Sequence, residues 1–277
     1  MTKLVQYPSG AYVLERDAYS TPVLETYHLG IDFGGLSAVN NFNIIVGPTE
    51  ISGLIGPNGA GKTTVFNLLT KVYQPSKGTI LVNGHDTSKM STVDVNKAGV
   101  ARTFQNIRLF DKMSVIDNVK VAMNNSMNYN PLHAIFRTPK YYKEEKRIHQ
   151  KALELLDIFN MSDLAETTAG SLPYGAQRRL EIIRALATKP LLLLLDEPAA
   201  GMNPNETKEL METIRGIRDK FNIAIILIEH DMSLVMNICE GIAVLNYGRI
   251  IAKGTPKDIQ NNPVVIEAYL GKPDQED

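Results

Sequence analysis

The sequence is poor in features that mark several common protein classes. It has one cysteine, Cys239, in 277 residues, and a net charge of −1. One cysteine cannot form an internal disulfide or a cysteine-rich metal cluster, so a packed thiol is its expected role. Its apolar runs, residues 191–195 and 223–228, are far shorter than the roughly 18 residues of a membrane-spanning helix. The near-neutral charge gives no indication of nucleic acid as a partner.

The first residues do not have the pattern expected of a secretory leader. Lys3 is followed by an interruption at residues 7–10, Tyr-Pro-Ser-Gly, rather than by a continuous apolar segment. We therefore expect the protein to remain in the cytoplasm and to reach a membrane only through a partner. Hydrophobic residues make up 44% and charged residues 21% of the chain, which is ordinary for a globular protein of one or two domains.

The most informative stretch matches the pattern G-x-x-x-x-G-K-[ST] in full. It consists of Gly56, Pro57, Asn58, Gly59, Ala60, Gly61, Lys62, Thr63 and Thr64. Glycines let successive main-chain N–H groups face an anion. Lys62 is expected to reach the β- and γ-phosphates, and the Thr63 hydroxyl is expected to bind Mg²⁺. An apolar strand at 51–55 and a helical pattern after residue 64 flank the loop, so nucleotide binding is favoured over a chance glycine-rich turn.

Strands and helices alternate through most of the chain, which predicts an α/β fold. Strands are expected at 23–29, 42–46, 51–55, 79–82, 99–105, 191–195 and 223–228, a turn at 31–35, helices at 148–159, 180–187, 207–220 and 232–239, and a hairpin at 242–252. The first strands alternate as an antiparallel β subdomain, and about 106–176 form an inserted α-helical subdomain. Residues 1–22 have no clear period and are interpreted as an extension, leaving 23–277 as one domain.

Polar residues follow the two buried strands at 191–195 and 223–228. Asp196 is expected at the carboxyl end of the sheet, where it can hold Mg²⁺, and Glu197 is suited to polarise a water for attack on a γ-phosphate. His230 follows the next strand. From the residues alone, it is either a hydrogen-bond partner of the γ-phosphate or a structural histidine.

Residues 172–179, Leu-Pro-Tyr-Gly-Ala-Gln-Arg-Arg, lie upstream of the acidic pair. They resemble the L-S-G-G-Q signature of ATP-binding cassette (ABC) ATPases, and the other motifs follow in that family's order. Residues 174–182, 197–204, 254–256 and 265–271 are similar to the ATPase subunit of branched-chain amino-acid importers. The resemblance implies a P-loop NTPase core of the ABC type.

The resemblance also assigns roles. Phe33 corresponds to an aromatic residue that stacks on adenine, although a core phenylalanine is the alternative. Gln105 corresponds to a glutamine that touches Mg²⁺ and links ATP to the membrane subunit. Glu197 corresponds to the general base and His230 to the switch histidine. With Lys62 these form the expected catalytic set, and Thr63, Gln105 and Asp196 the expected metal ligands. Two cassettes pair head to tail, so that Tyr174, Gly175, Ala176 and Gln177 of one cover the ATP of the other.

The sequence departs from the common family pattern at a few positions. Pro173 replaces the signature serine, which removes a hydroxyl and an N–H donor, and each lost charge-assisted bond costs about 1.5–3 kcal/mol. Tyr174 and Ala176 differ from the usual glycine and glutamine, although Tyr174 is typical of the importer subgroup. Asn203 stands where many members have an aspartate that helps communication across the dimer. The loss at Pro173 predicts weaker closure over ATP at this half of the site.

The expected function is Mg²⁺-dependent ATP hydrolysis that powers an importer of branched-chain amino acids, or of related amino acids or urea. The expected partners are permease subunits, a second cassette and, indirectly, a substrate-binding protein, at the cytoplasmic face of the inner membrane. Residues 106–119, with Arg108 and Phe110, are either a permease contact or an ordinary surface loop. A degenerate cassette with a regulatory role is the main alternative. A small-molecule kinase or GTPase is disfavoured, because residues 96–99, Asn-Lys-Ala-Gly, lack the aspartate of a guanine-reading motif.

Overall fold

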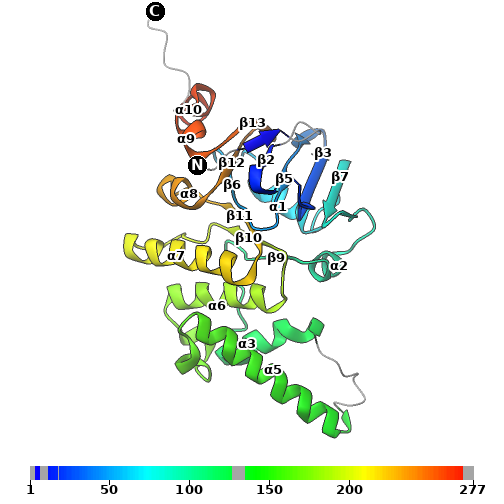
Figure 1. Cartoon of the computed structure of the whole chain (residues 1–277), viewed down its shortest axis with the longest axis vertical. Coiled ribbons are helices and arrows are strands. Elements are labelled where there is room, and N and C mark those ends of the chain that lie inside the picture. The colour runs from blue at the N-terminus through cyan, green and yellow to red at the C-terminus, as the bar shows by residue number, and fades with distance from the viewer. Residues whose placement is uncertain (1–3, 7–11, 18, 127–134, 271–277) are drawn as a thin grey trace, which may run out of the picture. The chain divides into compact units, whose positions relative to one another are not determined.

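The computed structural model describes residues 4–6, 12–17, 19–126 and 135–270. They form two compact units (Figure 1). The first contains the described residues of 1–102 and 191–277, and the second contains those of 103–190. The second unit is thus inserted into the first along the sequence. Within the described residues, none of the helices combines the length and the apolar character needed to cross a bilayer.

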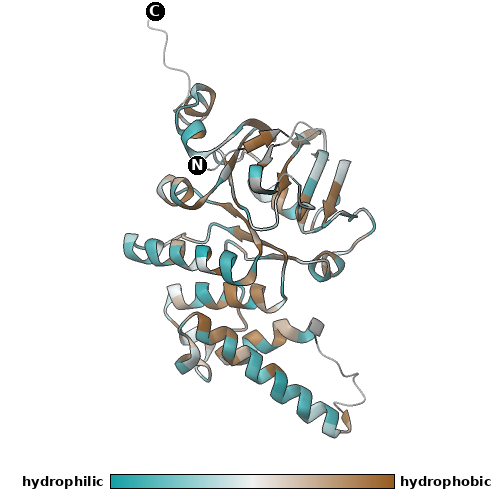
Figure 2. Cartoon of the chain, in the orientation of Figure 1, coloured by the Kyte–Doolittle hydropathy of each residue, from teal (hydrophilic) through white to brown (hydrophobic). Residues whose placement is uncertain are grey.

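The core of the first unit is a six-stranded sheet in the order β13-β12-β6-β11-β10-β9. Its strands are β6 (Ile51–Ile55), β9 (Val100–Arg102), β10 (Leu192–Asp196), β11 (Ala224–Ile228), β12 (Gly241–Asn246) and β13 (Arg249–Gly254). All neighbours are parallel except β12 and β13, which form the predicted hairpin. Every residue of β10 and β11 is buried, and Figure 2 shows these strands as hydrophobic, as expected for central parallel strands covered on both faces.

Helices follow these strands along the chain. They are α1 (Lys62–Leu69), α2 (Thr92–Lys97), α7 (Pro204–Phe221), α8 (Met232–Ile238), α9 (Pro256–Gln260) and α10 (Pro263–Leu270). The side chain of Asp231 accepts a hydrogen bond from the N–H of Leu234, which confirms its predicted role as the cap of α8. Asn203 caps α7 through the N–H groups of Asn205 and Glu206, so the residue that replaces the family's aspartate has a local structural role.

A second sheet in the first unit has the order β4-β3-β7-β8, with β5 also pairing β3, and all its pairs are antiparallel. Its strands are β3 (Leu24–Phe33), β4 (Leu36–Phe42), β5 (Ile45–Val46), β7 (Lys77–Val82) and β8 (His85–Asp86). The predicted antiparallel opening is confirmed. The turn predicted at 31–35 is confirmed only at Gly34 and Gly35, because β3 continues to Phe33 and β4 starts at Leu36.

The predicted strand at 42–46 is also wrong, since β4 ends at Phe42 and β5 starts at Ile45. Asn41 has a φ of 54°, and the side-chain amide of Asn43 donates to the main-chain oxygen of Asn41 at 2.8 Å. The side-chain oxygen of Asn43 accepts from the N–H of His28 at 2.7 Å. These side-chain bonds compete with the regular ladder and break the strand.

Part of the predicted N-terminal extension is ordered into strands. β1 (Leu4–Gln6) pairs antiparallel with β2 (Tyr12–Leu14), and a 3₁₀ turn (Glu15–Asp17) follows. The Leu14 side chain is buried, as is Asp17. Strands of 3 residues are too short to give a hydrophobic period, which explains why sequence reasoning missed them. Residues 1–3, 7–11 and 18 of that extension lie outside the described residues, as do residues 127–134 of the predicted helical subdomain and residue 271 of the stretch 265–271.

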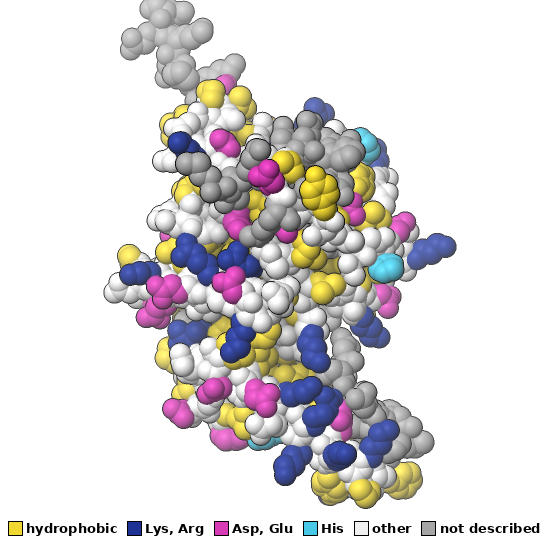
Figure 3. Space-filling model, viewed as in Figure 1, with side chains coloured by type: hydrophobic (Ala, Val, Ile, Leu, Met, Phe, Trp, Pro, Cys, Tyr) yellow, Lys and Arg dark blue, Asp and Glu magenta, His cyan; other side chains and the backbone are white. Residues whose placement is uncertain are grey.

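The second unit is helical. Its main helices are α3 (Val115–Ala122), α5 (Pro139–Ile158) and α6 (Tyr174–Ala187), with short 3₁₀ turns at Met123–Ser126, Ser162–Leu164 and Ala169–Ser171. Ile148, Ala152 and Leu156 of α5 are buried, as their helical spacing predicts. The N-terminal half of α5 is polar, and lysine and arginine side chains gather over it (Figures 2 and 3). α6 starts 6 residues before the predicted position, because it begins inside the signature.

The predicted strand at 99–105 ends early, at Arg102. The N–H of Phe104 donates to Glu181 of α6 at 3.1 Å, and the Phe104 main-chain oxygen accepts from Arg178 at 2.7 Å. Bonds to α6 therefore replace sheet pairing after residue 102. Gln105 lies in the second unit and not on a strand, which corrects that part of the prediction.

Candidate nucleotide site

The stretch from Gly56 to Thr64 lies between β6 and α1, as predicted. Gly56 has a φ of 150° and Gly61 one of 103°. A Cβ atom on Gly56 would lie 2.0 Å from the main-chain oxygen of Leu245, and one on Gly61 would lie 2.7 Å from that of Ala38. Only glycine fits these positions, because the loop packs directly against neighbouring carbonyl groups.

Lys62 is held at this loop. Its ammonium group donates to the main-chain oxygen atoms of Gly56, at 2.7 Å, and of Pro57, at 3.0 Å. Burial lowers the pKa of Lys62, and the negative charges of Glu197 and Asp196 act in the opposite direction. Lys62 therefore lies close enough to Glu197 and Asp196 for the opposite charges to attract each other.

Asp196 ends β10, and its carboxylate forms an ion pair with Arg102 of β9. The distance from the guanidinium to Oδ2 is 2.6 Å, and the two side chains are only 6% and 3% exposed. The same guanidinium donates to the side-chain oxygen of Asn67 in α1 at 2.7 Å. Sequence reasoning did not single out Arg102. An arginine in a predicted buried strand was the available signal, because such a charge needs a partner.

Glu197 and His230 meet at the ends of two neighbouring strands. Asp196 is paired with Ile228 in the parallel register of β10 and β11, and the Glu197 N–H donates to the Ile228 oxygen at 2.9 Å. The Glu197 carboxylate lies 2.8 Å from Nε2 of His230. Glu197 has a φ of 48°, a left-handed conformation that is uncommon for a glutamate and has to be supported by its surroundings. The structure therefore brings together the two residues that the sequence placed after separate strands.

The oxygen donors of the first unit suit magnesium. Thr63, at the start of α1, offers a hydroxyl, and Asp196 offers a carboxylate, both hard ligands of the kind that Mg²⁺ prefers. No cluster of three or more His, Cys, Asp or Glu side chains arranged for a metal occurs in the described ranges. Mg²⁺ needs few protein ligands, since it keeps several waters and uses substrate phosphates. The third predicted ligand, Gln105, belongs to the second unit.

Phe33 is exposed at the end of β3. Its side chain is 43% exposed, so the alternative of a core phenylalanine is wrong. The ring makes an edge-to-face contact with Tyr73, with centroids 5.3 Å apart and an interplanar angle of 75°. The two rings together offer an aromatic surface to a flat ligand, and Tyr73 was not predicted.

In the second unit the signature forms the N-terminus of α6. Pro173 is the N-cap and makes no side-chain capping bond, and Tyr174 is exposed. Ala176 is buried, and the Gln177 side chain donates to the main-chain oxygen of Leu172 at 2.8 Å. The first N–H groups of a helix have no partner within it and attract anions. Main-chain groups at Tyr174 and Gly175 are thus the signature's available donors.

Arg178, directly after the signature, is completely buried and was not predicted to be functional. Its guanidinium donates to the main-chain oxygen of Phe104 at 2.7 Å and to that of Gln105 at 2.8 Å, and pairs with Glu181 at 2.8 Å. Arg178 therefore fixes the main chain at Gln105 to α6. Its signal in the sequence was a charged residue on the buried face of a helix.

The region proposed for a permease contact is aromatic and basic. The guanidinium of Arg108 lies 4.2 Å from the centre of the Phe104 ring, and that of Arg184 lies 4.9 Å from the centre of the Phe110 ring. Phe110 remains 44% exposed. These stacked pairs give the loop a defined shape.

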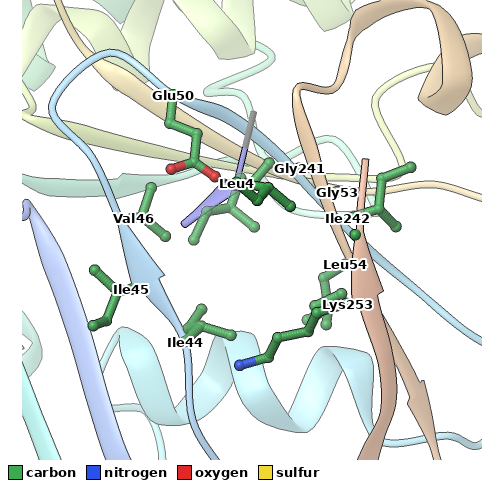
Figure 4. A pocket seen from close by; sticks show the side chains of 14 residues that line it. Leu4, Ile44, Ile45, Val46, Glu50, Gly53, Leu54, Gly241, Ile242 and Lys253 are labelled. Carbon is green, nitrogen blue, oxygen red and sulfur yellow. Dashed lines mark hydrogen bonds between the residues drawn. The ribbon is translucent and has the colours of Figure 1, made fainter. Parts of the chain in front are cut away.

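A separate cavity of about 40 Å³ lies in the first unit, and its lining includes no residue of the phosphate loop (Figure 4). It is lined mainly by aliphatic residues of β5, β6 and β12, together with Glu50 and Lys253. Burial raises the pKa of Glu50 to about 7 and lowers that of Lys253 to about 8. Its size suits water rather than a nucleotide.

A glycine-rich loop between a buried strand and a helix, with a lysine on the loop and acids at the end of a nearby parallel strand, defines the class of P-loop nucleoside triphosphatases. The comparisons with known proteins narrow this class. A family model described as "ABC transporter" matches residues 39–200, and one described as "Branched-chain amino acid ATP-binding cassette transporter" matches residues 249–275. The chain belongs to the ABC transporter family, and it is an ATP-hydrolysing cassette of that family.

Two relatives cover almost the whole chain. The chain is 46% identical to the high-affinity branched-chain amino acid transport ATP-binding protein BraF of Pseudomonas aeruginosa, over 91% of this chain and 99% of that protein. It is 47% identical to LivG of Escherichia coli, a protein of the same description, with the same coverage. A crystal structure of an ATP-binding cassette of an ABC transporter in its ADP conformation has 29% identity and a TM-score of 0.79, and covers 91% of this chain and 100% of that one. These relatives confirm the predicted family and fold.

Proposed function

We propose that this chain is the ATPase subunit of an importer for branched-chain amino acids, or for closely related amino acids or urea. The observation that carries the proposal is the identity of 46–47% to two cassettes of branched-chain amino-acid transport over nearly their whole length. The cargo itself contacts other subunits, so the cassette contributes the energy of ATP hydrolysis. Permease subunits are the direct partners, and a substrate-binding protein is an indirect one, which places the cassette at the cytoplasmic face of the inner membrane.

The site residues divide the work of hydrolysis. Main-chain N–H groups of residues 58–64 and the Lys62 ammonium hold the triphosphate, and Phe33 stacks on the adenine. Glu197 accepts the proton of the attacking water, and His230, 2.8 Å away, keeps that carboxylate oriented and reaches toward the γ-phosphate. Thr63 and Asp196 of the first unit would hold Mg²⁺, with Gln105 of the second unit as the further ligand that the family resemblance implies, and the ion would neutralise phosphate charge.

A second cassette completes the site. The N-terminus of α6 provides main-chain donors at Tyr174 and Gly175, and these cover the ATP of the partner cassette. Pro173 removes a donor and a hydroxyl from this half of the site. ATP-driven closure of the pair is therefore weaker than in cassettes with a serine there.

Uptake of radiolabelled leucine tests the proposal. The chain is expressed in Escherichia coli that lacks its own LivG, with Lys62→Ala and Glu197→Gln as inactive variants. We expect the wild-type chain to restore leucine uptake and both variants to fail. If the native permease does not accept the chain, the permease subunits that function with BraF in Pseudomonas aeruginosa are expressed with it. Uptake that is equal for wild type and Glu197→Gln in that system would overturn the proposal.

Pro173 favours one alternative, a cassette that binds ATP but hydrolyses it too slowly to drive transport. Turnover by the purified chain decides between the two. Turnover that depends on Glu197 supports the importer, whereas tight ATP binding without turnover supports the alternative.

A further inference from the structure

Glu229 stands between the last residue of β11 and His230 and has no part in the mechanism above. Its side chain points into the protein, and the residue is 4% exposed. A carboxylate is rarely buried to this degree unless it meets several hydrogen-bond donors.

The donors that meet Glu229 are main-chain N–H groups. Oε1 accepts from the N–H of Ala199 at 2.6 Å, and Oε2 accepts from that of His230 at 3.0 Å. The N–H of Asp231, at the cap of α8, is a third donor. Burial raises the pKa of Glu229, and the three main-chain bonds act against this shift.

These bonds connect two loops of the site. Ala199 lies two residues after Glu197, in the segment between β10 and α7, while His230 and Asp231 belong to the segment between β11 and α8. A main-chain bond from Glu197 to Ile228 at 2.9 Å and the contact of Glu197 with His230 at 2.8 Å join the same two loops. Glu229 thus adds hydrogen bonds between the two loops that carry Glu197 and His230.

We propose that Glu229 is a positioning residue for hydrolysis, which holds the loop of Glu197 and the loop of His230 in a fixed relation through main-chain hydrogen bonds. The inference rests on the proposed function and adds a buried residue that acts through the main chain of the two loops. The uncommon φ of 48° at Glu197 needs support from its surroundings, and the bond from Ala199 to Glu229 gives it.

The geometry requires two acceptor oxygens. A glutamine in place of Glu229 has one oxygen, so its NH₂ group must face at least one main-chain N–H. At least one of the two loops then loses its hydrogen bond to residue 229, although the side chain has kept its size. An aspartate keeps both oxygens but is shorter by one methylene group, so it can serve only part of the donors at the same distances.

The test is a comparison of Glu229→Gln with wild type and with a matched control, Glu240→Gln. Glu240 also accepts a main-chain hydrogen bond, from Ile51 at 3.1 Å, but it lies outside both loops. We expect Glu229→Gln to lower kcat for ATP by about 10- to 100-fold, the loss typical of a small misplacement of reacting groups, with KM and ATP affinity within about twofold of wild type. Glu240→Gln is expected to keep wild-type kcat, and Glu229→Asp to recover part of the loss.

Several outcomes would overturn the inference. One is a wild-type kcat in folded Glu229→Gln, and another is an equal fall of kcat in Glu240→Gln. If Glu229→Gln does not fold, Glu229→Asp decides, and a kcat equal to wild type in that variant, together with wild-type stability, counts against a positioning role. A wild-type protein that binds ATP without hydrolysing it contradicts the proposed function instead, so the two failures can be told apart.

Discussion

Arg102 and Asp196 form a buried ion pair across β9 and β10. The guanidinium lies 2.6 Å from Oδ2 of the aspartate that ends the central strand, and a second bond of 2.7 Å joins it to Asn67 of α1. One cation thus fixes the carboxylate proposed for Mg²⁺ to the helix that begins at the phosphate loop. Arg102, which belongs to neither motif, thus positions the end of β10 relative to the phosphate loop.

Removal of that cation is expected to destabilise the protein. Arg102→Ala leaves a buried carboxylate without its partner, which costs about 3–5 kcal/mol of unfolding free energy. Urea unfolding measures the loss. In an Asp196→Asn background, Arg102→Ala is expected to lower the free energy of unfolding by a smaller amount, because no buried carboxylate loses its cation. Equal costs in the two backgrounds would mean that the pair is not coupled.

Glu197→Gln is expected to separate binding from hydrolysis. Loss of a general base lowers turnover by about 10²- to 10⁴-fold, whereas the phosphate loop is unaffected, so ATP affinity is retained. Steady-state phosphate release and equilibrium binding of ATP measure the two effects. Glu212→Gln, the same substitution on an exposed position of α7, is the control and is expected to behave as wild type. Unchanged turnover in Glu197→Gln would remove Glu197 from its role.

Gly56→Ala is expected to abolish ATP binding and to lower stability. The new Cβ atom would lie 2.0 Å from the main-chain oxygen of Leu245, so the loop has to move. Gly216→Ala is the matched control, because this glycine lies in α7 with no heavy atom within 4 Å of an added Cβ. That change is expected to stabilise the protein by about 0.5–1 kcal/mol. ATP titrations and thermal unfolding of both variants give the comparison, and normal ATP binding by Gly56→Ala would contradict it.

Pro173→Ser is expected to strengthen closure of two cassettes over ATP. Serine restores a hydroxyl and an N–H donor at the signature, and it also provides the side-chain cap that α6 lacks, worth about 1 kcal/mol of stability. Sedimentation of Glu197→Gln protein with ATP reports on closure. Pro173→Ala restores the N–H alone. If serine and alanine variants dimerise equally, the hydroxyl makes no contribution.

Glu50 is expected to make stability depend on pH. Its pKa is raised by burial from 4.5 to about 7, so the folded state keeps this proton over a range in which the unfolded chain releases it. The contribution is fully present below pH 4.5 and is lost as pH rises toward about 7, amounting to about 3 kcal/mol. Glu50→Gln is expected to flatten this decline, as measured by urea unfolding at a series of pH values. An unchanged pH profile in the variant would contradict the assignment.

Much of the site could be predicted because its motifs are local. Residues 56–64 carry the loop chemistry within nine positions, and their flanking periods place them between a strand and a helix. Asp196, Glu197 and His230 each follow an apolar run that is long enough to indicate a buried strand. Since parallel strands end at the same edge of a sheet, their meeting was also predictable.

Other features had no local signal. The end of β9 at Arg102 depends on bonds from Phe104 to Arg178 and Glu181, which are more than 70 positions away. β1 and β2 are too short to show a period. The split of the strand predicted at 42–46 depends on side-chain bonds of Asn43 that a hydrophobic pattern does not record.

The sequence alone determined the class of chemistry, because a phosphate loop is written in consecutive residues whose backbone freedom and charge are intrinsic. It also determined which strands are central, since only a strand covered on both faces is apolar throughout. Tertiary structure decided which charges neutralise each other. Arg102 and Asp196 are far apart in the chain, as are Glu229 and its donor Ala199, and burial makes each pairing energetically necessary only after the sheet has formed.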